Sequence, residues 1–331
     1  MADINILMVG GRRTGKSSML AAMDKCCDEK LGDMEGVEVI CTSGSTMLME
    51  KISELQNYFV LDQYKEQNTF RPDDTPSDNN AEYEYEIRLN ERATGFTLRF
   101  NDAPGEAYDK PEDKEKVEKW VRNSQVLLIA IDTPHLLEEP DEVTEIGSGH
   151  KFFNRPDEIT RFIKTAFTTS KQHRMVLFVP MKCEKYYYTN KMAKVNEAVR
   201  RGYSDLFRHL QSSEVKEMCT VAITPILTIG GAQFFTFGGD VRNIGQYRYL
   251  KGDMRKYAPQ YCEQPMLMVL RYVLSVAEAS KKNQNPLMKW YLEKLRKRAS
   301  MKDLQENKKD IEDHIIMDKD LGFEVIQDPL R

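Results

Sequence analysis

The stretch ILMVGGRRTGKSS, residues 6 to 18, decides which fold the sequence predicts. Together with Asn5, its first residues up to Val9 make a short aliphatic run that is typical of a buried parallel strand. The residues from Gly10 to Ser17 fit the pattern GxxxxGK(S/T) at every position, and a helix is expected from Lys16 to about Leu31. A glycine-rich turn between a strand and a helix is the setting in which this pattern binds phosphate groups. The sequence therefore predicts a phosphate-binding loop.

The residues of this loop supply different parts of a phosphate site. Glycines let the loop wind so that successive backbone N–H groups point at phosphate oxygens, and the N-terminus of the following helix adds partial positive charge. Lys16 is expected to reach the terminal phosphates and to assist catalysis there, and Ser17 to ligate Mg²⁺. The predicted nucleotide-binding residues of the loop are Gly10, Gly11, Arg12, Arg13, Thr14, Gly15, Lys16, Ser17 and Ser18.

A second motif, LRFNDAPGE at residues 98 to 106, includes the second strand of a predicted β-hairpin. Asp102 at the end of that strand can hold Mg²⁺ through water, and Gly105 can offer its backbone N–H to the γ-phosphate. These motifs resemble those of Ras-like GTPases, in which a first-switch threonine before the hairpin completes the Mg²⁺ shell. The resemblance offers Thr75, preferred to Thr69 because it lies closer to the hairpin, and the alternative is a solvated loop threonine. The alternative is an ordinary turn, since Asp-Ala-Pro-Gly is also good turn chemistry. The predicted metal ligands are Ser17, Thr75 and Asp102.

The order of these motifs resembles that of the P-loop GTPases of the Ras-like translation-factor class, over about residues 4 to 280. DxxG after a hairpin, in particular, resembles the second switch loop of those proteins. A later segment, YAPQYCEQPM at residues 257 to 266, resembles bacterial double-GTPase-like proteins. The fold class expected is α/β, a three-layer P-loop NTPase fold with a mostly parallel sheet and one antiparallel edge strand, together with insertions and a C-terminal helical arm.

A third motif, PMKCE at residues 180 to 184, stands where the Ras-like GTPases carry NKxD or TKxD. In that family the lysine packs over the base, and the carboxylate accepts two hydrogen bonds from guanine N1 and N2. Adenine has no such pair of donors, so the carboxylate discriminates against it. The resemblance therefore assigns Lys182 and Glu184 to the base and GTP or GDP as the ligand, although Met181 replaces the family's amide or hydroxyl. A further base contact is expected from the backbone near residues 228 to 230.

Two positions bear on hydrolysis through the same resemblance. Glu106 stands where those enzymes often place a glutamine that orients the attacking water, and its negative charge would lie near the γ-phosphate. Arg12 stands where they place a small residue, so it could crowd the water or, as a guanidinium, neutralise Glu106 or stabilise transition-state charge. The alternative is that Arg12 and Arg13 point to solvent at the rim of the loop. We expect slow intrinsic hydrolysis that a partner or dimerisation would assist.

The rest of the chain divides by composition and periodicity. Residues 1–283 are predicted to form one GTPase domain with extra material at about 32–65, 135–155 and 232–264, and residues 284–331 a charged helical extension. Within the domain, predicted buried strands at 126–131, 175–180 and 220–227 alternate with helices at 47–64, 112–123, 156–167, 188–210 and 266–279. The extension, helical over 285–310, is either a peripheral helix or an arm that binds a partner.

Composition limits the class of protein. The 331 residues are 30% charged and 40% apolar, as in soluble globular proteins, and the net charge of −4 gives no reason to expect nucleic acid or an anionic membrane as partner. The longest apolar run, Val126 to Ile131, is too short to span a bilayer, and no basic region precedes an apolar stretch at the start. The six cysteines form no CxxC pair, so we expect reduced structural thiols in a cytoplasmic protein rather than zinc ligands.

The leading prediction is a GTP-hydrolysing molecular switch whose loops at 66–82 and 103–114 order on the γ-phosphate. Its effector or activating protein is unknown. Two alternatives stay open: a nucleotide-binding scaffold with little hydrolysis, as Glu106 and Met181 suggest, and a P-loop ATPase or small-molecule kinase. The sequence leaves the oligomeric state open.

Overall fold

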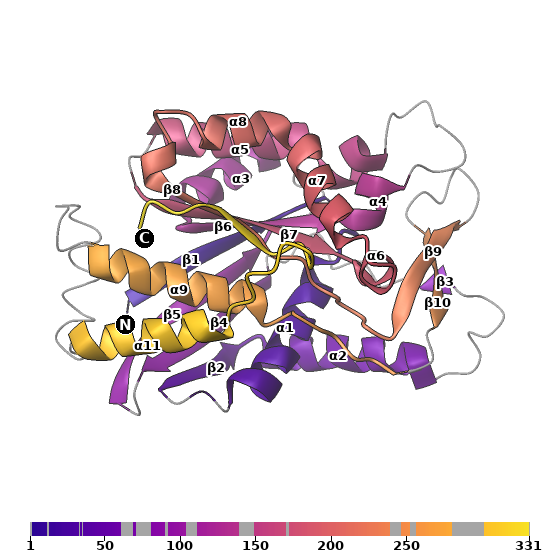
Figure 1. Ribbon diagram of the computed structural model, residues 1–331, viewed down its shortest axis with the longest axis horizontal. Helices are drawn as coiled ribbons and strands as arrows, with labels where there is room; N and C mark the ends of the chain where they lie inside the picture. The colour runs from indigo at the N-terminus through magenta and orange to yellow at the C-terminus, as the bar shows by residue number, and fades with distance from the viewer. Residues whose placement is uncertain are drawn as a thin grey trace.

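The computed structural model describes residues 2–11, 13–32, 34, 36–60, 69–70, 81–89, 92–103, 111–138, 149–169, 172–238, 246–251, 256–279 and 301–330. Within these residues, one large sheet with helices on both faces forms the body of the molecule (Figure 1).

The main sheet has eight strands. In chain order they are β1 (Ala2–Val9), β2 (Val37–Ser43), β4 (Ala81–Leu89), β5 (Arg92–Asp102), β6 (Val126–Asp132), β7 (Arg174–Met181), β8 (Cys219–Ile223) and β11 (Glu324–Gln327). Across the sheet the order is β11-β8-β7-β6-β1-β5-β4-β2. The centre, from β5 through β1, β6 and β7 to β8, is parallel, whereas β4, β2 and β11 each pair antiparallel with their neighbours. The strand with the phosphate loop therefore lies in the middle of the parallel region.

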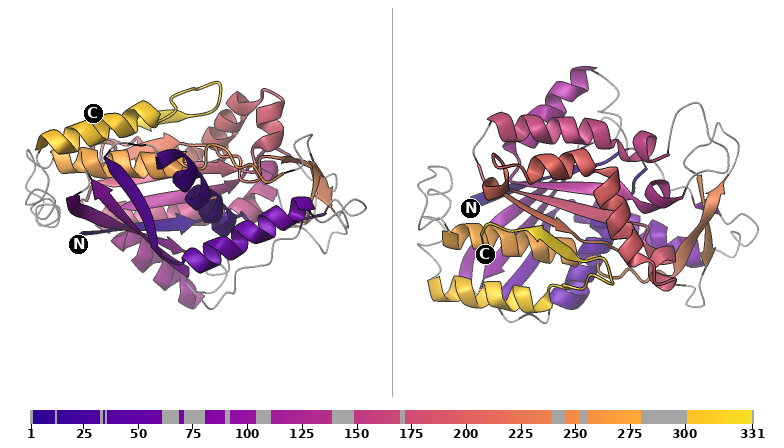
Figure 2. Two further views of the ribbon diagram at one scale, coloured as in Figure 1. Left: turned by 90° about the horizontal axis from the view of Figure 1, so that it is seen from below. Right: turned by 45° about the horizontal axis from the view of Figure 1, so that its top comes forward.

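Helices cover both faces of the sheet (Figure 2). On one face lie α1 (Lys16–Leu31), α2 (Ser45–Val60), α9 (Gln264–Ala279) and α11 (Met301–His314). On the other face lie α3 (Pro111–Asn123), α5 (Pro156–Thr169), α7 (Met192–Gly202) and α8 (Ser204–Leu210). The side chains of β1 explain the two layers, because Ile6 and Met8 pack with α1 and α9, while Leu7 and Val9 pack with α3 and α5.

Short elements gather where the central strands end. The helix α4 (Thr133–Leu137) follows β6 directly, the π-helix η3 (His150–Asn154) precedes α5, and α6 (Glu184–Tyr188) follows β7. A short 3-10 helix, η4 (Lys216–Met218), precedes β8 at the other end. A second sheet of three strands, in the order β3-β10-β9, lies beyond α6 in Figure 1. Its strands are β3 (Thr69–Phe70), β9 (Ala232–Gly238) and β10 (Gln246–Lys251).

The predicted α/β fold class is confirmed, with a mostly parallel sheet and an antiparallel edge. Some details differ from the sequence prediction. The strand β2 was not predicted within residues 32–65, and it extends the antiparallel edge beyond β4. The helix predicted over 188–210 is instead divided into α6, α7 and α8, because Asn190 has a left-handed backbone (φ 54) after α6 and Tyr203 stands between α7 and α8.

The C-terminal residues belong to the same body as the sheet. The expected charged helix is present as α11, at Met301–His314 rather than 285–310, and residues 280–300 lie outside the described part of the chain. Leu304 and Ile311 of α11 are buried in the core cluster that holds α9. After α11 the chain adds β11 to the edge at β8, a strand that was not predicted. Among the described helices, none combines the length and the apolar character needed to cross a membrane.

Candidate nucleotide site

The phosphate loop connects β1 to α1 and passes close to two other segments. An added Cβ at Gly10 would lie 2.9 Å from the carbonyl oxygen of Ala130, and one at Gly11 would lie 1.8 Å from that of Phe153. Backbone carbonyls of a packed strand and helix cannot move away cheaply, so both positions require glycine. Gly15, with φ +102, places the next residue at the start of α1. The loop therefore has the strand–turn–helix setting that the motif requires.

The side chains of Lys16, Ser17 and Asp102 converge beside the phosphate loop. The ammonium of Lys16 donates to the carbonyl oxygens of Gly10 (3.1 Å) and Gly11 (3.4 Å), and it lies 3.7 Å from Oδ1 of Asp102. Ser17 Oγ donates to Oδ2 of Asp102 at 3.1 Å. The parallel pairing of β1 with β5 explains the meeting, because it sets Met8 opposite Asp102 and so brings the end of β5 beside the loop. Thr14 Oγ1 donates back to Gly11 O at 3.0 Å, which closes the turn.

Asp102 is a buried carboxyl whose two oxygens differ in their contacts. Burial raises the pKa of Asp102, and the opposing effects of Lys16 and the Ser17 hydroxyl are smaller. Its Oδ1 accepts no hydrogen bond from the described residues. A hydroxyl and a carboxylate facing each other are oxygen ligands of the kind that Mg²⁺ prefers, and Mg²⁺ commonly keeps water between itself and one carboxylate. Ser17 and Asp102 therefore fit Mg²⁺.

Of the other predicted residues in and around the loop, the structure describes some and not others. Ser18 is buried in the first turn of α1, and the side chain of Arg13 is exposed. Arg12, Thr75, Gly105 and Glu106 lie outside the described residues, so their predicted roles in hydrolysis and metal binding remain predictions.

Lys182 reaches the phosphate loop from the end of β7. It has a left-handed backbone (φ 58), and its ammonium donates to the carbonyl oxygen of Arg13 at 3.0 Å. The same ammonium forms an ion pair of 2.5 Å with Asp132 Oδ2. Lys182 thus connects the ends of β6 and β7 with the loop.

Glu184 also lies beside the segment expected to contact the base. Its side chain is fully buried, and its Oε1 accepts hydrogen bonds from the backbone N–H groups of Ile229 (2.7 Å) and Gly230 (3.1 Å). Its Oε2 has no hydrogen-bond partner among the described residues. Burial raises the pKa of Glu184, while these two N–H groups favour the charged form. One carboxylate oxygen is therefore engaged by the protein, and the other remains able to accept hydrogen bonds from a ligand.

Asp132 and Asn154 lie beside the candidate site, and the sequence analysis did not single them out. Asp132 ends β6, the strand next to β1, and it is fully buried. The side-chain amide of Asn154 pairs with the backbone of Asp132, accepting from its N–H at 2.7 Å and donating to its carbonyl at 3.0 Å. One signal was available for Asp132, because a lone carboxylate ends the otherwise apolar run VLLIAID, and ligands bind at the carboxyl ends of parallel strands.

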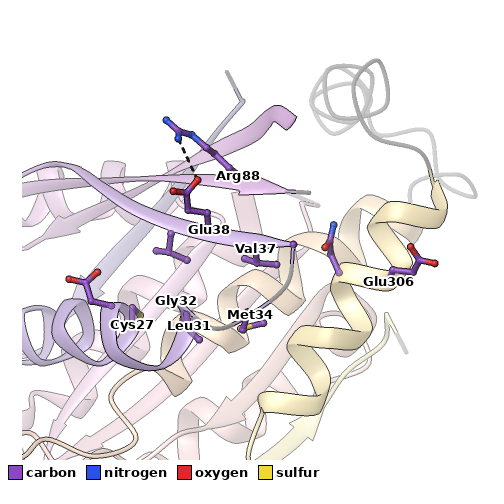
Figure 3. A pocket seen from close by; sticks show the side chains of 12 residues that line it. Cys27, Leu31, Gly32, Met34, Val37, Glu38, Arg88 and Glu306 are labelled. Carbon is purple, nitrogen blue, oxygen red and sulfur yellow. Dashed lines mark hydrogen bonds and ion pairs between the residues drawn. The ribbon is translucent and has the colours of Figure 1, made fainter. Parts of the chain in front are cut away.

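A cavity of about 920 Å³ lies away from this site, at the other end of α1 (Figure 3). Cys27, Leu31 and Val37 are among its apolar lining residues, and Glu38 and Glu306 are among its acidic ones. Cys27 is eleven residues after Lys16 in the same helix, which corresponds to about 16 Å along its axis. The cavity is therefore separate from the phosphate loop.

The sequence and the structure were compared with those of known proteins. No curated protein matches the sequence. Among solved structures, the GTP-bound GTPase-like domain of Ski7 from S. cerevisiae is similar at 15% identity and a TM-score of 0.38, over 69% of this chain and 43% of that one. The cytosolic domain of FeoB from L. pneumophila is similar at 9% identity and a TM-score of 0.24, over 93% of this chain and 89% of that one. The family model "Double-GTPase 2" matches residues 4–225, more than half of the 331 residues. The chain belongs to the Double-GTPase 2 family.

Proposed function

We propose that the protein binds GTP and GDP with Mg²⁺ and hydrolyses GTP to GDP and phosphate, as a molecular switch with slow intrinsic hydrolysis. The observation that carries the proposal is the convergence of Lys16, Ser17 and Asp102 at a strand–turn–helix loop, in a chain of a GTPase family. The switch would act in the cytoplasm on an effector or with an activator that is still to be identified.

The residues of the loop have separate tasks in this proposal. Lys16 now donates to two loop carbonyls, and it would turn from them to the terminal phosphates of a bound nucleotide. Ser17, Thr75 and Asp102 would hold Mg²⁺, with Asp102 acting through water. When bound, the ion neutralises charge that develops on the phosphate oxygens.

Preference for guanine is proposed for Glu184 and Lys182. The free Oε2 of Glu184 would accept hydrogen bonds from the N1 and N2 groups of guanine, and adenine would leave this buried oxygen unpaired. Since Oε1 already binds Ile229 and Gly230, the carboxylate is oriented before the base arrives. Lys182 would lie over the base with its ammonium on the phosphate loop.

Slow hydrolysis is proposed because Glu106 stands where the Ras-like GTPases often place a water-orienting glutamine. Arg12 would either crowd the attacking water or, as a guanidinium, neutralise Glu106 or stabilise transition-state charge. The same replacement of glutamine by Glu106 favours a second candidate function, a nucleotide-binding scaffold with little hydrolysis.

Calorimetry with Mg²⁺ and either GDP or ADP tests the proposal. We expect GDP to bind at least about a hundredfold more tightly than ADP, because the wrong base leaves buried polar groups unpaired. Lys16→Ala should weaken GDP binding about tenfold or more, as expected for losing charge-assisted hydrogen bonds. Lys25→Ala is the matched control, because Lys25 is on the same helix and pairs with Glu29 rather than with the loop.

Single-turnover GTP hydrolysis then separates a switch from a scaffold. A switch should hydrolyse bound GTP at a rate below about 10⁻² s⁻¹, in the range of GTPases without an activator. That rate should still exceed the rate of GTP hydrolysis in buffer alone. Tight ADP binding without GDP binding would contradict the proposal.

A further inference from the structure

The buried ion pair between Lys182 and Asp132 lies where three segments of the site meet. We propose that Asp132 is a positioning residue for nucleotide binding, which acts by holding the Lys182 side chain against the phosphate loop. The inference rests on the proposed function, since Lys182 is assigned there to the base.

The first observation is the geometry around Lys182. Its ammonium contacts the Asp132 carboxylate at 2.5 Å and the Arg13 carbonyl at 3.0 Å, so one side chain bridges the end of β6 and the phosphate loop. Its stem also follows the loop, because a Cβ at Gly15 would lie 3.8 Å from Lys182 Cε. The side chain is 11% exposed, so most of its length is packed against protein.

The second observation is that Asp132 is itself fixed by hydrogen bonds to its carboxylate, its backbone N–H and its backbone carbonyl. Its Oδ1 accepts a hydrogen bond from the backbone N–H of His135 (3.1 Å), as the N-cap of α4. Its own backbone N–H and carbonyl are both paired with the Asn154 amide, at 2.7 and 3.0 Å. Asn154 belongs to η3, whose Phe153 carbonyl lies against Gly11. The carboxylate is therefore fixed relative to the phosphate loop.

These contacts give a physical reason why Asp132 would strengthen nucleotide binding. A lysine side chain has many rotamers, and ordering it when a ligand binds reduces affinity. Asp132 orders Lys182 before the nucleotide arrives, because its carboxylate holds the Lys182 ammonium. Without the carboxylate, a buried ammonium would have lost its anionic partner and would turn toward solvent.

A purely structural ion pair is the alternative, and a nearby pair provides the comparison. Lys185 of α6 pairs with Glu138, which follows α4, at 2.7 Å. This pair connects the same two regions of the chain as Lys182 and Asp132. Its side chains are more exposed, at 28% and 31%, and none of its described contacts is to the phosphate loop. Glu138→Gln is therefore the matched control for Asp132→Asn.

The test measures GDP affinity by calorimetry, together with the thermal unfolding midpoint, for Asp132→Asn, Lys182→Met, the double variant and Glu138→Gln. We expect each single change in the Lys182 pair to weaken GDP binding about tenfold. The double variant should bind GDP no more weakly than Lys182→Met alone, because Asp132 acts through Lys182. Glu138→Gln should bind GDP like the parent.

Several outcomes would overturn the inference. One is GDP affinity like the parent's in Asp132→Asn. Another is a loss of GDP affinity in the double variant equal to the product of the two single losses. A third is a loss of GDP affinity in Glu138→Gln as large as that in Asp132→Asn. If Asp132→Asn does not fold, Asp132→Glu keeps the charge but displaces it by one methylene, and unchanged affinity in that variant overturns the inference too. A parent chain that binds neither GDP nor GTP contradicts the proposed function itself, whereas a parent that binds GDP with insensitive variants contradicts only the role of Asp132.

Discussion

His135 lies in a stack of three rings beside the candidate nucleotide site. Its ring is parallel to those of Phe153, at 3.9 Å between centroids, and Phe237, at 4.5 Å. Burial lowers the pKa of His135 to about 4, against a smaller opposing effect of Asp132. The stack connects η3, which lies against the phosphate loop, with β9 of the small sheet. A charged ring at this place would therefore disturb the support of the loop.

The lowered pKa of His135 predicts a loss of stability in acid. Above pH 6.5 neither the folded nor the unfolded chain protonates this residue, so its contribution is constant. As the pH falls below 6.5, the unfolded chain binds the proton first, and at pH 5 the folded state is less stable by about 2 kcal/mol on account of this residue. His135→Phe keeps the ring stack. In urea unfolding, this variant should lose about 2 kcal/mol less in the free energy of unfolding between pH 7 and pH 5 than the parent does. His314→Phe, at a side chain that is 46% exposed, is the control. Equal pH dependence in His135→Phe and the parent would contradict the prediction.

At the scale of elements, a buried arginine links α9 to the C-terminal segment. Arg271 is 2% exposed, and its Nε donates to Glu312 of α11 at 2.9 Å. Its Nη2 forms an ion pair with Asp328, which follows β11 and is 5% exposed. The two partners thus bring α11 and the end of β11 to the same helix. This arrangement explains why a strongly charged segment packs on the body.

Removing this arginine should loosen the C-terminal segment. Arg271→Met keeps the apolar stem but leaves the Asp328 carboxylate buried without its cation, and losing one partner of a buried pair costs about 3 kcal/mol or more in the free energy of unfolding. Arg208→Met is the matched control, because Arg208 pairs with Asp205 at 2.8 Å while both side chains are more than half exposed. That variant should lose less than about 1 kcal/mol. Denaturation in urea measures both, and similar losses in the two variants would contradict the role given to burial.

At the scale of the whole molecule, the sequence predicted the centre of the fold better than its edges. β6 and β7 are buried along their whole length, and each is apolar except for one charged residue at its end, so both can be recognised from their own sequence. β2 and β11 are edge strands with partly exposed residues, VEVICTS and EVIQ. Polar residues interrupt their apolar runs, and β11 has only four residues, so neither gives a clear strand signal. Edge pairing depends on which neighbour is available, which is a property of the assembled sheet.

The residues of the candidate site also differ in how well the sequence predicts them. Lys16 and Ser17 belong to a contiguous motif, and Asp102 follows from a hairpin, so each could be assigned from its immediate neighbours. The pair of Asp132 and Lys182 spans 50 residues, and Asn154 reaches Asp132 across 22. The hydrogen bonds from Ile229 and Gly230 to Glu184 likewise join separate loops. Such contacts arise only when parallel strands bring their carboxyl ends to one edge of the sheet.

The last strand, β11, protects the edge of the main sheet, and removing it should affect the whole molecule. β8 is a fully buried strand, and without β11 its open edge would be free to pair with another chain. Deletion of residues 324–331 also removes Gln327, whose amide donates to the carbonyls of Lys216 (2.9 Å) and Cys219 (2.7 Å). We expect the shortened chain to unfold at lower urea concentration and to self-associate with rising concentration in size-exclusion chromatography with light scattering. Gln327→Ala retains the backbone pairing of β11 and should keep the oligomeric state of the parent. A shortened chain with the parent's mass at every concentration and the parent's unfolding midpoint would show that β8 does not need this cover.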